Sequence, residues 1–515
     1  MPLLASVAVI LCTAMVLIVW SVMGGFLNML IGSGRTMTGD VIITWPNAGF
    51  AYYDELIADL KKEPLVEAAA PMIETFGLIA LPDGRKETVT VRGIIGPEFA
   101  KVSKYNDILH WKPIKEPMPK DEFREDPRLG NIDRLSWSEI YDNGLNLRVK
   151  DKSGEYKPAM VMGIEASGFN YRTPEGFYQP ATRRQAMPDG TFKLIDMFLP
   201  RDGKILLSLA PLDESGRVVE MVSRNFPIAN EFQSGVYEVD ERVVLIPLDV
   251  AQEMLHLHAA KRIPKANPAK ESASVGPTVL PDPNQPETFP DIPSVANLID
   301  DPARATHVLI RGKGDMESTE QAIALRKRCE AVYAAFAERH AHHVPAKESI
   351  RILTWEEQNE TMIGAVKTET ALLLVLFMII SLVAVFLILA IFWSMVAEKT
   401  KDIGVLRAVG ASGAGVAGLW VMYGLAIGLV GSALGMVLAF TIVHNINPIH
   451  EWLGMKLGIV VWNPKVYYFT IIPNKVQLDT AIIVFVFGVL SSAIGALVPA
   501  VRAALMHPVR ALRFE

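Results

Sequence analysis

The chain alternates between long apolar stretches and regions dense in polar side chains. Four mainly apolar stretches occupy residues 1–32, 365–397, 413–444 and 479–503. A helix needs about 20 apolar residues to cross a bilayer, and a spanning segment must satisfy its own backbone hydrogen bonds. The pattern therefore predicts an α-helical membrane domain of four transmembrane helices.

The first stretch has an alternative interpretation as a cleaved signal peptide. Leu3 to Ile31 carries no charged residue, and no basic region precedes it. A signal peptide has an apolar core of only about 7–15 residues after a basic start. The length of this run favours an uncleaved membrane helix.

Residues 39–359 are polar and separate the first two apolar stretches. Asp40–Trp45, Val66–Pro71 and Thr88–Ile95 have strand character, whereas Tyr52–Lys62 has helical periodicity. This order predicts a large α+β domain with its helices on one face of a sheet. The domain would be extracytoplasmic and inserted between the first two membrane helices.

The second half of this polar region contains further strands and a long insertion. Met160 to Leu248 has mostly strand character, which suggests a second subdomain. Residues 261–306 are rich in proline and cannot bury a core, so an extended or disordered excursion is expected. Ser318–His340 is predicted as a helix. Its apolar face would carry Ala322, Leu325, Cys329, Val332 and Phe336.

A charged segment follows the second apolar stretch directly. Residues 398–412 open with Glu398-Lys399-Thr400-Lys401-Asp402, after which Ile403, Leu406 and Val409 recur at near-helical spacing. This segment is too polar to enter a membrane and too amphipathic for a plain loop. A short helix on the membrane surface is expected.

Basic residues orient the chain in the membrane. Three lie in segment 398–412 and three more lie at the end of the fourth stretch and in the tail 504–515. Short loops rich in lysine and arginine stay in the cytoplasm, and long domains are exempt from this rule. Both termini and segment 398–412 are therefore expected inside, with residues 39–359 and the loop 445–478 outside.

Glycines recur in the third apolar stretch at Gly424, Gly428, Gly431 and Gly435. Small residues let membrane helices approach closely. The spacing alone does not distinguish packing within this chain from a contact between two chains.

Several motifs resemble the ABC permeases of the lipoprotein-releasing type (LolC/LolE-like). Thr354–Asn359 matches a Thr-Trp-x-x-x-Asn approach, Glu398–Ile403 matches Glu-Lys-x-x-Asp-Ile, and Leu406–Ala411 matches Leu-Arg-x-x-Gly-Ala. Ser21–Phe26 and the C-terminal Pro499–Glu515 also follow the family pattern, apart from His507 in place of an aspartate. The Leu-Arg-x-x-Gly-Ala motif is shared with the wider macrolide-exporter and cell-division permease superfamily.

The resemblance implies a permease subunit in the bacterial inner (plasma) membrane. In this family a separate ATPase dimer binds ATP and Mg, so no cofactor is expected in this chain. Two permease chains, identical or different, transmit force that lifts lipoproteins from the outer leaflet toward a periplasmic carrier. The family also has a cytoplasmic amphipathic segment before the first helix. Here Met1 opens directly on apolar residues, so either translation starts upstream or that segment is missing.

The resemblance also assigns two sets of site residues. The first set would couple the chain to the ATPase and comprises Glu398, Lys399, Lys401, Asp402, Ile403, Leu406, Arg407 and Gly410. The second set lies at the outer ends of the first two helices and suits acyl-chain contact: Met23, Phe26, Leu27, Leu30, Met362 and Ile363. Helix packing or bulk lipid contact is the alternative role for these apolar side chains.

Other functions lack a matching pattern in the sequence. No G-x-x-x-x-G-K-[ST] phosphate loop occurs, so the chain is not expected to be its own ATPase, and no catalytic residues are assigned. A net charge of −6 suggests no nucleic-acid partner. Two histidine clusters could suggest a metal, but exposed helix ends explain them better. These clusters are His256 with His258, and His340 with His342 and His343.

Two alternative functions remain open. One is a signalling permease that acts on an extracellular partner such as a cell-wall hydrolase. The other is a permease that exports a drug or a peptide. The large outer domain and the Trp355–Asn359 approach favour lipoprotein release.

Overall fold

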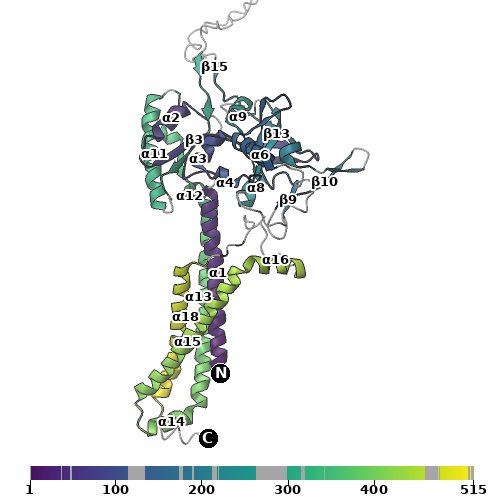
Figure 1. The fold of residues 1–515 in the computed structure, drawn as a ribbon. Coiled ribbons are helices and arrows are strands. Elements are labelled where there is room, and N and C mark those ends of the chain that lie inside the picture. Colours follow the sequence, from purple (N-terminus) through teal and green to yellow (C-terminus); the bar gives the residue numbers. More distant parts are fainter. Residues whose placement is uncertain are drawn as a thin grey trace, which may run out of the picture. The chain divides into compact units, whose positions relative to one another are not determined.

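The computed structural model divides the chain into two compact units. The helical unit contains residues 1–33 and 359–515, and the α/β unit contains residues 34–173 and 178–358. Figure 1 shows the elements of both units. The structure describes residues 2–35, 37–46, 49–113, 134–172, 178–187, 191–195, 197–211, 217–218, 220–262, 299–314, 319–341, 343–458, 472, 474, 476–507 and 511.

A nine-stranded sheet forms the centre of the α/β unit. Its spatial order is β12-β13-β7-β14-β4-β3-β18-β1-β19. The strands are β1 (Val41–Thr44), β3 (Val66–Ala80), β4 (Lys86–Ile94), β7 (Met160–Gly163), β12 (Lys204–Leu209), β13 (Val222–Phe232), β14 (Val243–Pro247), β18 (His307–Gly312) and β19 (Arg351–Thr354). A turn at 82–85 joins β3 to β4, and Gly84 has a φ of +90° there.

Helices cover both faces of this sheet, not one face as the sequence suggested. On one face, α2 (Tyr53–Leu60) and α11 (Thr319–Arg339) pack on a core that contains Val41 and Ile43. On the other face, α3 (Gly96–Val102) and α4 (Tyr105–Ile108) pack around Ile42. β1 is apolar on both sides because both sides are buried, a pattern typical of two-sided sheets.

β3 and β4 join the two regions that the sequence separated into subdomains. One half of β3 pairs with β18, and its other half, Gly77–Ala80, pairs with β12. Because β12 also pairs with β13, six strands close on themselves: β12, β13, β7, β14, β4 and β3. The strands of Met160–Leu248 are therefore continuous with the first sheet within one compact unit.

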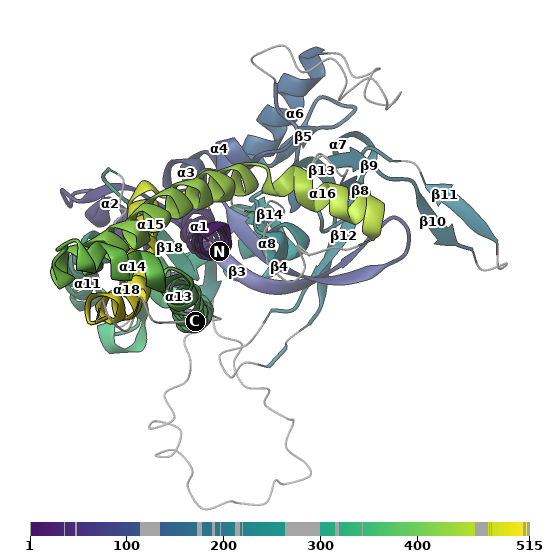
Figure 2. The ribbon, with the colours of Figure 1, turned by 90° about the horizontal axis from the view of Figure 1, so that it is seen from below.

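Smaller elements complete the α/β unit. Its further helices are α6 (Arg134–Asn146), α7 (Leu199–Asp202), α8 (Tyr237–Arg242), α9 (Leu248–Met254), the 3-10 helix η2 (Lys347–Ser349) and α12 (Trp355–Gln358). Two-stranded pairs are formed by β2 (Phe50–Ala51) with β17 (Arg304–Ala305), β5 (Arg148–Lys150) with β6 (Tyr156–Pro158), β8 (Asn170–Arg172) with β9 (Tyr178–Pro180), β10 (Arg183–Ala186) with β11 (Phe192–Ile195), and β15 (Ala260–Arg262) with β16 (Ile299–Asp301). Figure 2 shows the β10–β11 hairpin extending from its unit.

The predicted proline-rich insertion is described only at its two ends. β15 and β16 pair there, from Ala260–Arg262 to Ile299–Asp301, so these ends form a hairpin stem. Residues 263–298 lie outside the described residues. The expectation of an extended or disordered excursion is untested.

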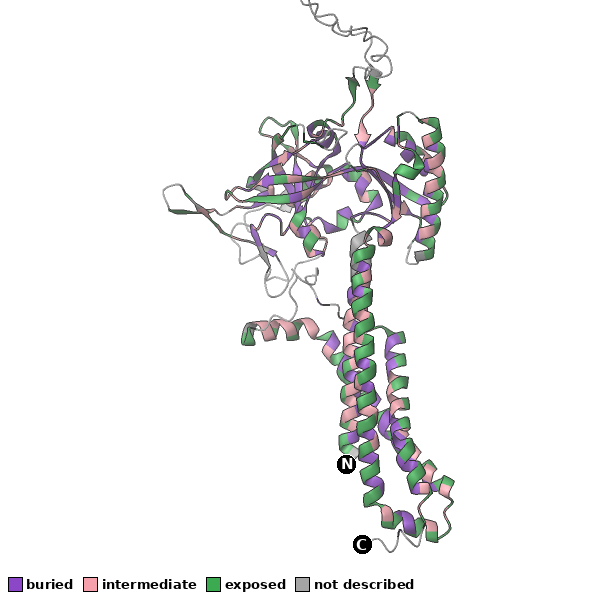
Figure 3. Cartoon of the chain, turned by 180° about the vertical axis from the view of Figure 1, so that it is seen from behind, coloured by how far each residue is buried: buried purple, intermediate pink, exposed green. Residues whose placement is uncertain are grey.

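The helical unit contains four helices that are long and apolar enough to cross a membrane, within the described residues. They are α1 (Pro2–Arg35), α13 (Glu360–Glu398), α15 (Gly413–His444) and α18 (Leu478–Ala504). α14 (Thr400–Ala408) connects α13 to α15. Figure 3 shows that much of the surface of these helices is exposed in the single chain, as expected for helices that face lipid or another chain.

The glycines of α15 pack within this chain. A β-carbon on Gly424 would lie 2.5 Å from the Cβ of Ala496, and one on Gly428 would lie 2.8 Å from that of Ser492, both on α18. Gly431 approaches α1 at Val9 in the same way, with 2.8 Å to its Cβ. The four-residue repeat therefore serves contacts inside the unit.

Residues 445–478 contain a helix where the sequence suggested only a loop. α16 runs from Ile446 to Leu457 directly after α15. Its Asn447 side chain donates to the carbonyl of Ile472 at 3.0 Å and accepts from its N–H at 2.9 Å. The sequence signal was weak because the segment is short and contains a proline.

Candidate functional site

α14 is fixed at both ends by local hydrogen bonds. Thr400 Oγ1 donates to the carbonyl oxygens of Val396 and Ala397, at 3.1 and 2.7 Å. Beyond the helix, Ser412 Oγ accepts from the N–H of Gly415 at 3.0 Å and caps the start of α15. α14 is thus a short helix between two long apolar helices, with hydrogen-bonded residues on both sides of it.

Ile403 holds α14 against the helical unit. It is 3% exposed and belongs to the same buried cluster as Val396 and Ala500, from α13 and α18. Gly404 is buried beside it. The sequence assigned Ile403 to the set that contacts the ATPase, whereas in the single chain it is buried. Its side chain packs against other residues of the helical unit.

Three apolar side chains of α14 are exposed instead. Val405 is 51% exposed, Leu406 is 49% exposed and Val409 is 85% exposed. We call these three residues the exposed α14 face. Within the chain they lack the burial that apolar side chains normally have, which marks a surface suited to a partner.

The charged residues of the segment surround this face. Glu398, Lys399, Lys401 and Asp402 are all exposed. Lys399 Nζ lies 3.1 Å from a carboxylate oxygen of Asp402. An exposed pair of this kind contributes little to stability, which leaves both groups available to a partner.

Arg407 and Gly410 shape the end of α14. Gly410 has a φ of +110°, the left-handed conformation that glycine adopts readily at a helix end. Arg407 is half-buried, and its Nη1 donates to the carbonyl of Ala411 at 3.5 Å. Its Nε is buried. Both residues therefore support the turn from α14 to α15.

The six apolar residues expected to contact acyl chains differ in their exposure. Phe26 is 6% exposed and Ile363 is 4% exposed, so packing explains both. Met23 and Leu27 keep part of their surface. The side chains of Leu30 and Met362 lie outside the described set.

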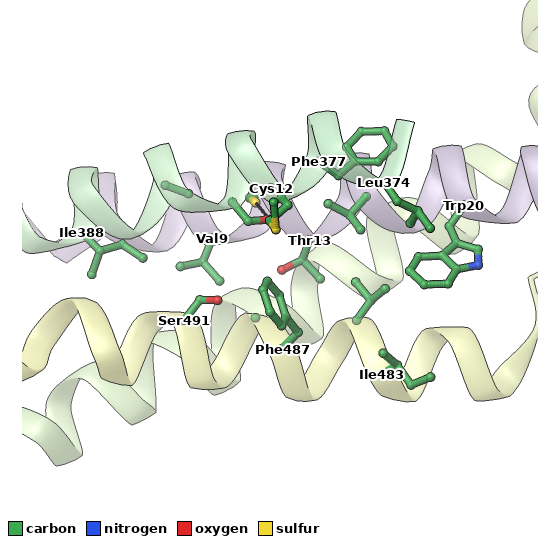
Figure 4. A pocket seen from close by; sticks show the side chains of 16 residues that line it. Val9, Cys12, Thr13, Trp20, Leu374, Phe377, Ile388, Ile483, Phe487 and Ser491 are labelled. Carbon is green, nitrogen blue, oxygen red and sulfur yellow. Dashed lines mark hydrogen bonds between the residues drawn. The ribbon is translucent and has the colours of Figure 1, made fainter. Parts of the chain in front are cut away.

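An apolar cavity lies between α1, α13 and α18, as Figure 4 shows. Its volume is about 240 Å³. Its lining includes Val9, Cys12, Thr13, Trp20, Leu374, Phe377, Ile388, Ile483, Phe487 and Ser491. Cys12 Sγ and Ser381 Oγ are 3.8 Å apart at its wall. Nearly apolar walls suit a hydrocarbon chain better than a polar ligand. Of the predicted contact residues whose side chains the structure describes, none lines the cavity.

The histidine clusters lie among aromatic and acidic neighbours. His340 stacks on Tyr52 with ring centroids 4.6 Å apart, and its Nε2 is 3.1 Å from a carboxylate oxygen of Glu55. His343 contacts the edge of the same tyrosine ring. His256 lies 3.5 Å from Glu220. His342 is outside the described residues. In the part of the chain that the structure describes, no group of three or more potential metal ligands occurs.

Sequence reasoning missed two features of the site. Val405 and Val409 were not assigned to the coupling set, although their spacing of four residues was visible. The cavity had no sequence signal, because its lining is apolar throughout and comes from three helices that are distant in the chain.

Comparisons with known proteins match two separate parts of the chain. Residues 374–508 match the family described as FtsX-like permease C-terminal. Residues 3–224 match the family described as MacB-like periplasmic core domain. The first match covers α14 with its flanking helices, and the second covers α1 and much of the α/β unit.

Curated relatives extend the comparison. The lipoprotein-releasing system transmembrane protein LolC of Xylella fastidiosa (strain 9a5c) is 28% identical over 161 residues, which are 31% of this chain and 39% of that protein. LolC of Neisseria meningitidis serogroup B is 26% identical over 169 residues, 33% of this chain and 41% of that protein. LolE of Haemophilus influenzae is 28% identical over 130 residues, 25% of this chain and 31% of that protein.

The chain spans about two-fifths of the length of the LolC proteins it matches. The two family matches do not overlap. The motifs of segment 398–412 fall within the FtsX-like match. Together with the relatives, they show that the chain is similar to LolC/LolE-like permeases and to the MacB/FtsX superfamily.

Proposed function

We propose that this chain is the permease subunit of an ABC transporter that extracts lipoproteins from the outer leaflet of the bacterial inner membrane. A separate ATPase dimer would bind ATP and Mg and supply the energy. A second permease chain, identical or different, would complete the membrane part. The relatives named as lipoprotein-releasing proteins support the cargo class.

The exposed α14 face is the observation that carries this proposal. Leu406 presents half of its surface, whereas Ile403, one helical turn earlier, is buried in the unit. A partner that grips Leu406 would therefore push on a helix already locked to α13 and α18. Because Ile403 packs against α13 and α18, a displacement of α14 would also move these two helices.

The direction of transmission follows from the chain. α13 runs for 39 residues from Glu360 to Glu398. It begins two residues after the end of the α/β unit and ends two residues before α14. A continuous helix transmits displacement along its axis, because each turn is held by backbone hydrogen bonds. Closure of the ATPase dimer would thus move α13 and the domain attached to its far end. In this arrangement α14 and both termini are cytoplasmic, and the α/β unit is periplasmic.

The cargo would enter through its acyl chains. The cavity between α1, α13 and α18 has almost wholly apolar walls, and Met23 and Leu27 retain exposed surface on α1. Both would suit hydrocarbon leaving the outer leaflet. A periplasmic carrier would accept the released lipoprotein.

The test uses the full chain with its co-purifying subunits. Leu406→Glu would bury an unpaired carboxylate at the docking surface, so retention of the ATPase on a tagged permease should fall at least about tenfold. Leu406→Met keeps an apolar side chain of similar volume and should retain it. Lipoprotein release to a soluble acceptor should follow the same order.

A second variant separates docking from folding. Ile403→Glu places a charge in the buried cluster and should lower the thermal stability of the permease itself. Leu406→Glu should leave that stability unchanged because Leu406 is half exposed. If Leu406→Glu holds the ATPase as tightly as the wild type does, the exposed α14 face is not the coupling surface.

A further inference from the structure

A depression opens between α13 and α18 at the end of the helical unit that carries α14. It encloses about 530 Å³. Seven residues line it: Trp393 from α13, and Val498, Val501, Arg502, Leu505, Met506 and His507 from α18 and the residues that follow it. It is separate from the cavity of Figure 4, because the two share no lining residue.

One cation dominates this depression. The guanidinium carbon of Arg502 lies 3.9 Å from the centroid of the Trp393 ring. Stacking on tryptophan covers one face of a guanidinium and leaves its edge N–H groups pointing outward. Across the residues that the structure covers, no carboxylate forms an ion pair with Arg502. The charge is thus held in place by an aromatic ring, and its donors remain available.

The walls beside this cation are apolar and exposed. Val498 is 52% exposed, Val501 is 48% exposed and Leu505 is 75% exposed. They lie at intervals of three and four residues along α18, so they form one stripe on the helix surface. On a membrane-spanning helix such a stripe is covered by hydrocarbon. Arg502 lies two residues before the end of α18, so in a spanning helix it would lie near the level of the lipid headgroups.

We propose that this depression binds an anionic phospholipid from the leaflet adjoining α14. The phosphate would accept hydrogen bonds from the fork of Arg502, which matches the geometry of phosphate oxygens. The acyl chain would lie along Val498 and Val501. His507 would line the headgroup side. The lining combines a cation with apolar side chains, which suits a lipid. A soluble phosphate has no acyl chain and would make no favourable contact with Val498 and Val501.

Charge complementarity selects the anionic class. Basic pockets at the ends of membrane helices bind anionic headgroups. A zwitterionic lipid would bring its ammonium group next to Arg502, and the two cations would repel each other. The site therefore favours phosphatidylglycerol over phosphatidylethanolamine.

The experiment uses the full chain, with its co-purifying subunits, in nanodiscs of phosphatidylethanolamine with or without phosphatidylglycerol. Native mass spectrometry then counts the lipids retained after release. Charged hydrogen bonds contribute enough free energy for about a tenfold preference, so the wild type should retain phosphatidylglycerol about tenfold over phosphatidylethanolamine. Arg502→Gln should abolish this preference. Arg502→Lys keeps the charge without the fork and should give an intermediate value.

Two further arms decide between the possible explanations. Lys367→Gln removes an exposed cation of the same unit that lies outside the depression, and it should leave retention unchanged. Excess inorganic phosphate should not displace the lipid. The proposal is overturned if Arg502→Gln and Lys367→Gln behave alike, if inorganic phosphate competes fully, or if a co-purifying subunit occupies the depression and no lipid is retained.

Discussion

Gly428 and Ser492 lie so close that a β-carbon on the glycine would be 2.8 Å from the Cβ of the serine. The backbone of α18 leaves no more room, since Val489 O would lie 3.1 Å from the same atom. Ser492 Oγ also donates to the carbonyl of Gly424 at 2.9 Å. α15 and α18 are therefore joined through backbone approach and a buried hydrogen bond between them.

Gly428→Val should separate these two helices. The added atoms must displace Ser492 or the α18 backbone, a form of overpacking that typically costs about 1–3 kcal/mol. We expect a lower unfolding temperature for the purified permease in detergent. Gly418→Val on the same helix is the matched control, because no atom lies within 4 Å of its β-carbon position. Equal stability of the two variants would contradict close packing at Gly428.

A buried carboxyl group in the α/β unit predicts a pH-dependent stability. Glu231 is 1% exposed and accepts hydrogen bonds from Trp111 Nε1 at 2.8 Å and from Asn170 Nδ2 at 2.7 Å. Burial raises the pKa of Glu231 to about 7, against the hydrogen bonds, which lower it. Asp240 is buried as well, and burial raises its pKa to about 7.

The sign follows from proton binding. Below the unfolded pKa of about 4.3, both states hold the proton and the stabilisation is complete. Between that value and about 7 the unfolded chain releases its proton and the folded chain keeps it. The free energy of unfolding should therefore fall as the pH rises, by up to about 4 kcal/mol for Glu231.

Glu231→Gln should make this decline shallower. The glutamine amide stays neutral between pH 5 and pH 8, so it removes the titration. Its NH2 group cannot accept a hydrogen bond, so one of the donors Trp111 and Asn170 loses its acceptor and the variant should be less stable at low pH. Hydrogen exchange of the β7 and β13 amides at pH 5 and pH 8 measures the effect. Glu253→Gln, at an exposed ion pair with Arg224, serves as the control. A slope unchanged by Glu231→Gln would show that the buried carboxyl does not titrate in this range.

Cys329 should act as a reporter of α11 detachment. Its side chain is completely buried, and burial raises the pKa of its thiol to about 12. Since the thiolate is the nucleophile, a maleimide should label it only after α11 leaves the sheet. Cysteine at exposed Lys327 on the same helix should react at least about 100-fold faster. Comparable labelling rates in the folded chain would rule out this packing.

Thiol labelling also tests the proposed topology. Lys152 and Lys401 are both exposed, one in the α/β unit and one in α14. With a reagent that does not cross the inner membrane, Lys152→Cys should be labelled in intact cells. Lys401→Cys should be labelled only after permeabilisation, and the wild-type chain gives the background. Labelling of both variants in intact cells would refute opposite locations for the two units.

The sequence by itself predicted those features that depend on consecutive residues. The length of uncharged runs predicted long apolar helices, and the structure has four among its described residues. The strand character of Met160 to Leu248 was confirmed, for example by β12 at Lys204–Leu209. The buried face of α11 was confirmed at Ala322, Leu325, Cys329 and Phe336. These features follow from local periodicity and from the cost of leaving a backbone unpaired, so no knowledge of neighbours was needed.

Only the tertiary structure showed which residues cover the apolar faces of α14 and α15. Periodicity placed Ile403 and Leu406 together, yet one is buried under α13 and α18 and the other is exposed. It left open whether the glycines of α15 meet this chain or another, and α18 and α1 fill that space. The sequence records which side chains share a surface. Whether a surface is buried depends on which helix or strand from another part of the chain packs against it. Only the tertiary structure therefore distinguishes the buried Ile403 from the exposed Leu406.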